Sequence, residues 1–88
     1  HAQQPIDLID AQFFFPDGPA AAEIARTMQL PLSIKARGSD ITLWGAQDFA
    51  RRQMLDASRA AAGMLAVSRD LARQMAAMGM DPGKITVR

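Results

Sequence analysis

The residues best suited to chemistry in this chain form one short segment, Arg37-Gly38-Ser39-Asp40, which follows an apolar run. The guanidinium of Arg37 presents a planar fork of donors that suits a phosphate or a carboxylate. Gly38 lets the backbone approach a ligand closely, while Ser39 and Asp40 can bond sugar-type hydroxyls or cap a following helix. The same spacing is also typical of a capped polar turn, so the residues alone leave a binding site and a turn both open.

Two further polar residues become candidates because of where strands are expected to end. Gln12 lies near the end of the first expected strand, and Ser68 comes just after the third. Ligands of open parallel sheets bind beyond the carboxyl ends of the strands, where helix N-termini and short loops collect. A parallel sheet would therefore bring Gln12, Arg37 and Ser68 to one edge.

The residues that the sequence lacks exclude several kinds of chemistry. The chain has no cysteine and a single histidine, His1, so it has neither a disulfide framework nor the ligands of a zinc site. No expected strand is followed by the Gly-x-Gly-x-x-Gly or Gly-x-x-x-x-Gly-Lys-Ser/Thr pattern of nucleotide-binding loops. We therefore expect no metal, no cofactor and no catalysis by Cys or His within this chain.

The aromatic residues point less clearly to a function. Phe13-Phe14-Phe15 is more typical of a core segment than of an aromatic binding platform. Trp44, beside Gly45 in an expected loop, either lines a pocket or covers the sheet edge. The sequence does not separate these two alternatives.

Length and composition indicate one small globular domain. Of the 88 residues, 49% are hydrophobic and 22% charged, which is typical of folded rather than disordered chains. The 10 basic and 9 acidic residues are interspersed, which argues against a nucleic-acid partner. No window approaches the roughly 18 apolar residues of a membrane span, and no secretory pattern opens the chain. We expect a cytoplasmic protein and, since the chain runs from His1 to Arg88 without an initiating methionine, a piece of a larger one.

Apolar periodicity predicts strands and helices in alternation. Strands are expected at residues 6–14, 32–36, 63–67 and 84–87, and helices at 20–28, 46–61 and from about 69 to 78. Asp17 or Gly18 is expected to cap the first helix, Ser68 to cap the third, and Gly79 to end it. The residues expected to face the core are Ile24, Ala25 and Met28 in the first helix, Phe49, Ala50, Met54, Ala57 and Ala61 in the second, and Leu71, Ala72, Met75 and Met78 in the third.

This alternation predicts an α/β fold, a Rossmann-like (βα)3β half-domain with a four-stranded parallel sheet and three helices. If consecutive strands are neighbours, right-handed crossovers place the helices on one face of the sheet and leave the other face bare. We expect the bare face to expose Val, Ile, Leu and Phe side chains and to favour a homo-oligomer. A non-catalytic module that self-associates through this face is one of the two functions considered.

The other function comes from a resemblance that covers nearly the whole chain. The segments IDLIDAQFFFPDGPAAAEIARTMQLPLSIKARGSDI and ASRAAAGMLAVSRDLARQMAAMGMDPGKITVR resemble the later half of the N-terminal domain of family-4 retaining glycosyltransferases, which have the GT-B fold. The most specific parts are FPDGPAAA, the GSDI loop and AVSRDLARQMAAMGMDPGKITV. The resemblance implies an enzyme that moves a sugar from a nucleotide-sugar donor to an acceptor in an interdomain cleft, with retention and without a metal.

The same resemblance implies what this chain contributes to such an enzyme. Residues 1–88 would form a single partial domain on the acceptor side, with the C-terminal nucleotide-sugar-binding domain absent, so the isolated chain would be inactive. The partners would be a nucleotide-sugar donor and an acceptor of unknown identity. The location would be cytoplasmic, including a peripheral position at the inner membrane face.

The resemblance also selects the candidate site residues. Members of the family commonly have a histidine where this chain has Arg37, and another histidine often occupies the place of Gln12. We expect Arg37, the catalytic candidate, to neutralise donor phosphate or to contact a hydroxyl. The substrate-binding candidates are Gln12, Asp17, Gly18, Arg37, Gly38, Ser39, Asp40 and Ser68.

Overall fold

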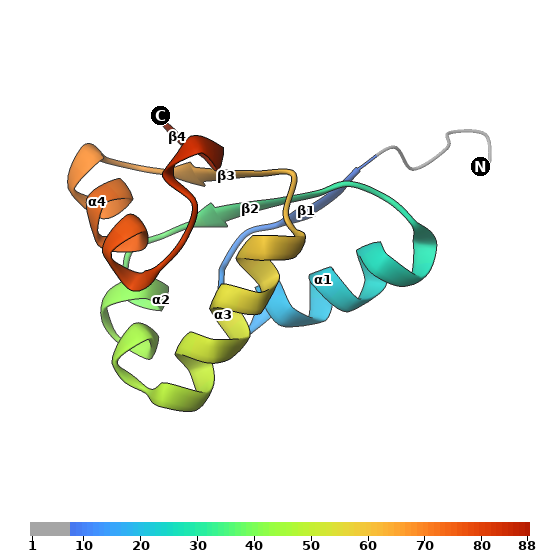
Figure 1. The fold of residues 1–88 in the computed structure, drawn as a ribbon, viewed down its shortest axis with the longest axis horizontal. Helices are drawn as coiled ribbons and strands as arrows, with labels where there is room; N and C mark the ends of the chain where they lie inside the picture. The colour runs from blue at the N-terminus through green and yellow to red at the C-terminus, as the bar shows by residue number, and fades with distance from the viewer. Residues whose placement is uncertain (1–7) are drawn as a thin grey trace.

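The structure, a computed structural model, describes residues 8–88, along which strands and helices alternate (Figure 1). The strands are β1 (Ile9–Ala11), β2 (Leu32–Ala36), β3 (Gly63–Ala66) and β4 (Ile85–Val87). The α-helices are α1 (Asp17–Met28), α2 (Ser39–Thr42), α3 (Asp48–Ala60) and α4 (Arg69–Met78), and short 3-10 turns span Trp44–Ala46 and Pro82–Lys84. None of the helices within residues 8–88 has the length and hydrophobicity to cross a membrane.

The four strands form one parallel sheet in the order β1-β2-β3-β4. Each strand lies beside the next one in sequence, and the connecting helices lie on one side of the sheet (Figure 1). The Rossmann-like α/β fold expected from the sequence is confirmed. The structure adds a fourth helix to the three expected, because the polar segment after β2 forms the short helix α2 rather than a loop.

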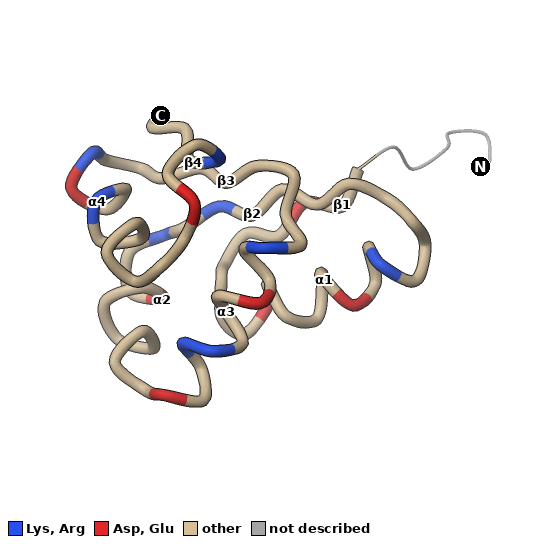
Figure 2. Tube along the Cα trace, in the orientation of Figure 1, with Lys and Arg blue, Asp and Glu red and all other residues tan. Residues whose placement is uncertain are grey.

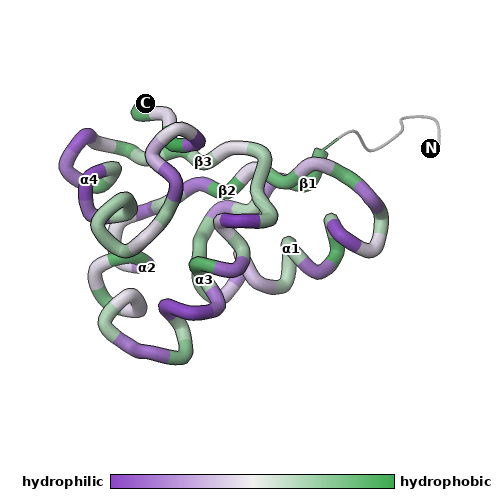
Figure 3. Tube along the Cα trace, in the orientation of Figure 1, coloured by the Kyte–Doolittle hydropathy of each residue, from purple (hydrophilic) through white to green (hydrophobic). Residues whose placement is uncertain are grey.

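Alternate strand residues and one stripe of each longer helix build the core. Leu32, Ile34 and Ala36 of β2 are buried, as period-2 alternation requires for residues on one side of a sheet. Figure 3 shows hydrophilic and hydrophobic residues alternating along α3 and α4. The core residues of these two helices are Ala50, Met54, Ala57, Leu71 and Met75, all among those expected from the sequence.

Three other residues expected in the core lie at the surface instead. Phe49 is exposed, and Ile24 and Met28 of α1 are half exposed, so only Ala25 of the three expected in that helix is buried. Helix α1 packs on α3, and each helix buries an alanine, Ala25 in α1 and Ala57 in α3. Small residues let the two helices approach closely, so the larger side chains of α1 stay outside the contact.

The uncovered face of the sheet is more polar than expected. Ser33 and Lys35 of β2 alternate with the buried residues of that strand and therefore point to this face. Their partners in the sheet register are Asp10 in β1, Gly63 and Leu65 in β3 and, beyond Leu65, Thr86 in β4. The expectation that this face exposes apolar side chains holds for Leu65, which lies beside Lys35, but Asp10, Ser33 and Thr86 make the rest of the face polar.

The largest boundary differences from the sequence prediction lie at the end of β1 and the start of α1, whereas the boundaries of α3, β3 and β4 differ by one or two residues. Strand β1 ends at Ala11 rather than at Phe14, while Ile6 and Asp7 of the expected strand lie outside the described residues. Helix α1 begins at Asp17, three residues before Ala20, and no side chain caps its first turn, so Asp17 and Gly18 are helical residues rather than caps. Beyond the end of β1, the N–H of Phe14 bonds to Asp40 of the candidate site instead of to a neighbouring strand.

Candidate functional site

Arg37 and Gln12 meet at the carboxyl ends of β1 and β2, each directly after the last residue of its strand. Arg37 Nε donates to the backbone carbonyl of Gln12 at 3.2 Å, and Arg37 Nη2 donates to Gln12 Oε1 at 3.1 Å. The guanidinium also lies over the ring of Phe13, 5.4 Å from its centroid. The structure therefore brings together two of the residues that the parallel topology was expected to place at one edge.

The exposed guanidinium of Arg37 retains hydrogen-bonding capacity for a ligand. Its bonds to Gln12 use two of the five N–H donors of an arginine. Gln12 Nε2 donates to Asp10 Oδ2 at 2.9 Å, which leaves Gln12 Oε1 facing Arg37. The remaining donors of Arg37 can bind a phosphate or carboxylate oxygen while Gln12 and Phe13 hold the guanidinium in place.

Asp40 lies beneath this pair and is almost completely buried, with 1% of its surface exposed. Its Oδ1 accepts backbone N–H groups of Arg37 at 3.1 Å, Gly38 at 2.9 Å and Ile41 at 3.0 Å. Its Oδ2 accepts the backbone N–H of Phe14 at 2.8 Å, which takes that group out of any strand pairing. Both carboxylate oxygens are thus engaged within the protein, and direct binding of substrate by Asp40 stays a prediction.

Gly38 occupies a backbone conformation that favours glycine. Its φ is +123° and its ψ is −65°, a region that residues with a side chain rarely adopt. Its carbonyl accepts the N–H of Ile41 at 3.0 Å and of Thr42 at 2.8 Å, and so begins helix α2. A Cβ added at Gly38 would meet no atom within 4 Å, so the backbone angle and not crowding selects glycine here.

The two candidate serines lie at helix starts near the same end of the sheet. Ser68 follows β3, and its Oγ accepts the backbone N–H of Leu71 at 3.1 Å, which confirms the expected N-cap of α4. Ser39 is the exposed first residue of α2, and its side chain makes no capping bond. The hydroxyls of both residues are accessible to solvent, and their binding roles stay predictions.

Asp17 and Gly18, the candidates at the start of α1, differ in accessibility. Asp17 is exposed in the first turn of α1. Gly18 is buried, and a Cβ added there would lie 3.7 Å from Ala57 Cβ and 3.5 Å from the carbonyl oxygen of Phe13. Both distances are ordinary van der Waals contacts, so neither crowding nor a positive φ selects glycine at this position, and substrate binding by either residue stays a prediction.

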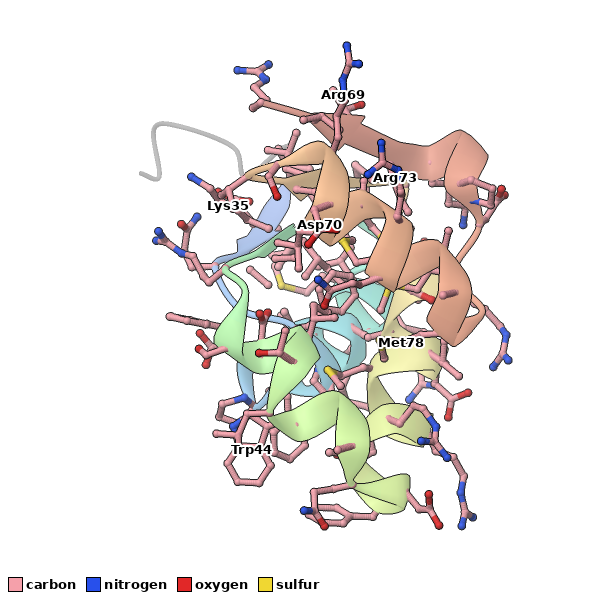
Figure 4. The ribbon with its side chains drawn as sticks, turned by 90° about the vertical axis from the view of Figure 1, so that its left-hand side faces the viewer. Lys35, Trp44, Arg69, Asp70, Arg73 and Met78 are labelled. Carbon is pink, nitrogen blue, oxygen red and sulfur yellow. The ribbon has the colours of Figure 1, made fainter. Side chains whose placement is uncertain are left out.

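Basic residues gather at the end of the sheet where β2, β3 and β4 finish. These strands end level, because Ala36 pairs with Ala66, which pairs with Val87. The arginines that follow the three strands are Arg37, Arg69 and Arg88. Figure 2 shows basic residues at the end of β2 and the start of α4, and in Figure 4 Lys35, Arg69 and Arg73 extend from this end of the molecule.

The helices on the other parts of the surface carry their charge differently. Most acidic and basic residues of α1 and α3 form ion pairs one turn apart: Glu23 with Arg26, Asp48 with Arg51 and Asp56 with Arg59. At the strand ends, the exposed acidic residue Asp70 accepts a hydrogen bond from Gln74 rather than from an arginine. The carboxyl end of the sheet thus has more basic than acidic side chains: Lys35, Arg37, Arg69, Arg73 and Arg88 against Asp10, Asp40 and Asp70. We call it the electropositive end of the sheet, and it suits an anionic ligand.

The three consecutive phenylalanines separate in the structure. Phe14 is completely buried, as expected for a core residue, whereas Phe13 lies at the surface under Arg37. The Phe15 ring is 5.0 Å from that of Trp44 and 5.9 Å from that of Phe49, between ring centroids. The prediction that this triplet fills the core is confirmed for Phe14 and in part for Phe15, which is half-buried against the core, and is wrong for Phe13. Trp44 joins Phe15 in an aromatic cluster next to α2 (Figure 4).

A groove of about 450 Å³ lies elsewhere, between α1 and α3. Its walls include the paired Glu23 and Arg26 and the neighbouring Gln53 and Asp56, and they contain none of the candidate site residues. Within residues 8–88 no three His, Cys, Asp or Glu side chains come together in a way that could hold a metal ion. We therefore take the arginine-rich carboxyl ends of the strands as the candidate functional site.

A comparison with protein families identifies the family of this chain. The family model described as Glycosyltransferase Family 4 matches residues 1–88. No curated protein is similar enough to this chain to count as a match.

Proposed function

The chain belongs to glycosyltransferase family 4, and we propose that it is the acceptor-side part of a two-domain GT-B enzyme. The proposed enzyme transfers a sugar from a nucleotide-sugar donor to an acceptor with retention of configuration. The family match supports glycosyl transfer, and the basic residues at the strand ends support a site for a charged donor. The nucleotide-binding domain and the cytoplasmic location implied by the resemblance stay predictions.

The contact between Arg37 and Gln12 at the strand ends is the observation that carries this proposal. When the bond between the sugar and the diphosphate breaks, negative charge grows on the leaving phosphate oxygen. A guanidinium already held in position stabilises that charge without reorganising at the moment of reaction. Arg37 has donors left for such an oxygen, and it stands at the electropositive end of the sheet.

Neighbouring polar groups suit the hydroxyls of a sugar or an acceptor. The exposed hydroxyls of Ser39 and Ser68 and the amide of Gln12 can each donate or accept a hydrogen bond. Gly38 has no side chain, so a ligand can come close to the backbone there. We assign these four residues to substrate binding around Arg37.

Substitution of Arg37 tests the proposed function in the transferase that contains residues 1–88. With a panel of nucleotide sugars as donors, we expect Arg37→Ala to lower kcat/KM on the order of 10²-fold, because a charge-assisted contact to the leaving group is lost. The free energy of unfolding should barely change, since Arg37 is exposed.

A matched control uses the exposed Arg52 on α3, which should tolerate alanine with kcat/KM within about twofold of the original value. The isolated chain of 88 residues should turn over none of the donors, because the proposed nucleotide site lies on another domain. If Arg37→Ala leaves kcat/KM within about twofold, the segment is a polar turn and Arg37 has no role in transfer.

A further inference from the structure

The buried carboxylate of Asp40 joins two segments that are far apart in sequence. One segment is the turn after β2, where Asp40 Oδ1 accepts the backbone N–H groups of Arg37, Gly38 and Ile41. The other segment follows β1, where Asp40 Oδ2 accepts the N–H of Phe14 at 2.8 Å. A single side chain therefore fixes the spacing between the two loops that carry Arg37 and Gln12.

We propose that Asp40 is a positioning residue that holds Arg37 against Gln12 and acts on the transfer reaction only through Arg37. This inference rests on the proposed function, because it assigns Asp40 a role in the same site. Asp40 itself touches no ligand in this proposal, since it is 1% exposed and both of its oxygens already accept hydrogen bonds.

The arrangement of bonds explains how the effect of Asp40 reaches the guanidinium. Arg37 contacts Gln12 and the Phe13 ring, which directly precede the Phe14 amide that Asp40 holds. The loop after β1 and the loop after β2 are thus linked by two sets of contacts: the buried hydrogen bonds of Asp40 and the exposed contacts of Arg37. Water competes weakly with the buried link, so the inner bond can keep the outer, exposed contact in register.

The chemistry of the side chain explains why an aspartate suits this position. Four backbone N–H groups point at its two oxygens, and a buried carboxylate is tolerated only when such donors satisfy it. Asparagine has one acceptor oxygen, so its NH2 group would face either Phe14 N–H or the donors of the turn. If the oxygen stays with the three donors of the turn, Asp40→Asn breaks the link to Phe14.

A double-mutant cycle in the transferase tests whether Asp40 acts through Arg37. We expect Asp40→Asn alone to lower kcat/KM about 10- to 100-fold, the scale of a misplaced catalytic group. In the Arg37→Ala background the same change should alter kcat/KM by less than about twofold, because the group it positions is already gone. Thr42→Val is the matched control in α2: it removes the bond from Thr42 Oγ1 to the Gly38 carbonyl and should leave kcat/KM nearly unchanged.

The outcomes separate this inference from the proposed function. Equal losses from Asp40→Asn in both backgrounds would overturn the positioning role, because Asp40 would then act independently of Arg37. No loss from Arg37→Ala would show that Arg37 has no role in transfer and would overturn the positioning role with it, whereas failure of the unmodified transferase to use any donor would overturn the proposed function itself.

A measurement on the unmodified chain covers the case in which the Asp40 variants do not fold. By NMR-detected hydrogen exchange, the Phe14 amide should exchange roughly tenfold or more slowly than the neighbouring amides of Gln12 and Phe13, because Asp40 holds it in the interior. Exchange of Phe14 at the rate of those neighbours would contradict the bond on which the inference depends.

Discussion

Gly38 shows how a single backbone angle shapes the candidate site. Its positive φ turns the chain between β2 and α2, so that the N–H groups of Arg37 and Gly38 point at the same oxygen of Asp40. A residue with a Cβ would strain at this angle even though space is available around it. The site therefore depends on glycine for conformation rather than for room.

Gly38→Ala tests this dependence by its effect on stability. We expect the free energy of unfolding to fall by about 1–3 kcal/mol in urea titrations, the cost of forcing a side chain into this region. Gly63 in β3 is the matched control, because its φ lies outside the positive region and an added Cβ would make only an ordinary contact, 3.9 Å from the Lys84 carbonyl oxygen. Equal losses from Gly38→Ala and Gly63→Ala would show that the angle at Gly38 carries no special cost.

Helix α4 illustrates how local signals fix an element and its direction. Ser68 caps its first turn, Asp70 places a negative charge near the positive helix end, and Gly79 ends it with a φ of +117°. These signals lie within the helix or beside it in sequence, which is why they could be found without the fold. The helix is in turn what carries Arg69 and Arg73 to the electropositive end of the sheet (Figure 4).

The N-cap of α4 should make a measurable contribution to stability. Ser68→Ala removes the hydroxyl that accepts the Leu71 N–H, and we expect it to cost about 1 kcal/mol of unfolding free energy. Ser39→Ala at the start of α2 is the control, since the Ser39 side chain makes no capping bond. Thermal unfolding of the two variants compares them directly, and a Ser39→Ala loss as large as that of Ser68→Ala would contradict the capping role.

At the scale of the whole molecule, the two most exposed large apolar side chains of residues 8–88 lie at the aromatic cluster. Leu43, which precedes Trp44, and Phe49 are 63% and 55% exposed, whereas on the uncovered sheet face Leu65 lies among the polar residues Asp10, Ser33 and Lys35. Large exposed apolar side chains that gather in one place favour contact with another surface. Self-association, which the sequence suggested through the sheet, is therefore expected to use the region of Leu43 and Phe49.

Sedimentation analysis over a concentration series tests which surface the chain uses for self-association. The average mass of the unmodified chain should rise above that of the monomer with concentration, and the double variant Leu43→Ser/Phe49→Ser should stay monomeric because the apolar contact is lost. A double variant of the sheet face, Lys35→Ser/Leu65→Ser, should behave like the unmodified chain. Loss of association in the sheet variant, or a monomer in every sample, would contradict the expectation.

The sequence by itself determined the order of the main elements, the fold class and part of the site. Period-2 and helical spacing place apolar residues on one side of each element, and parallel topology then brings residues that follow β1 and β2 to a common edge. The positions of Arg37 and Gln12 at that edge and the capping role of Ser68 could be predicted in this way. These inferences succeeded because they depend on local patterns or on the topology alone.

Only the tertiary structure decided what Asp40 does and how the aromatic triplet divides. Asp40 bonds to Phe14, 26 residues earlier in the chain, and that contact joins the loop after β1 to the turn after β2. The sequence pattern around Asp40 is the same for a ligand-binding carboxylate and for a buried one, because nothing local reports which backbone N–H groups will face it. Its role follows from the packing of two loops that are adjacent only in the folded sheet, where a buried carboxylate must find its donors within the protein.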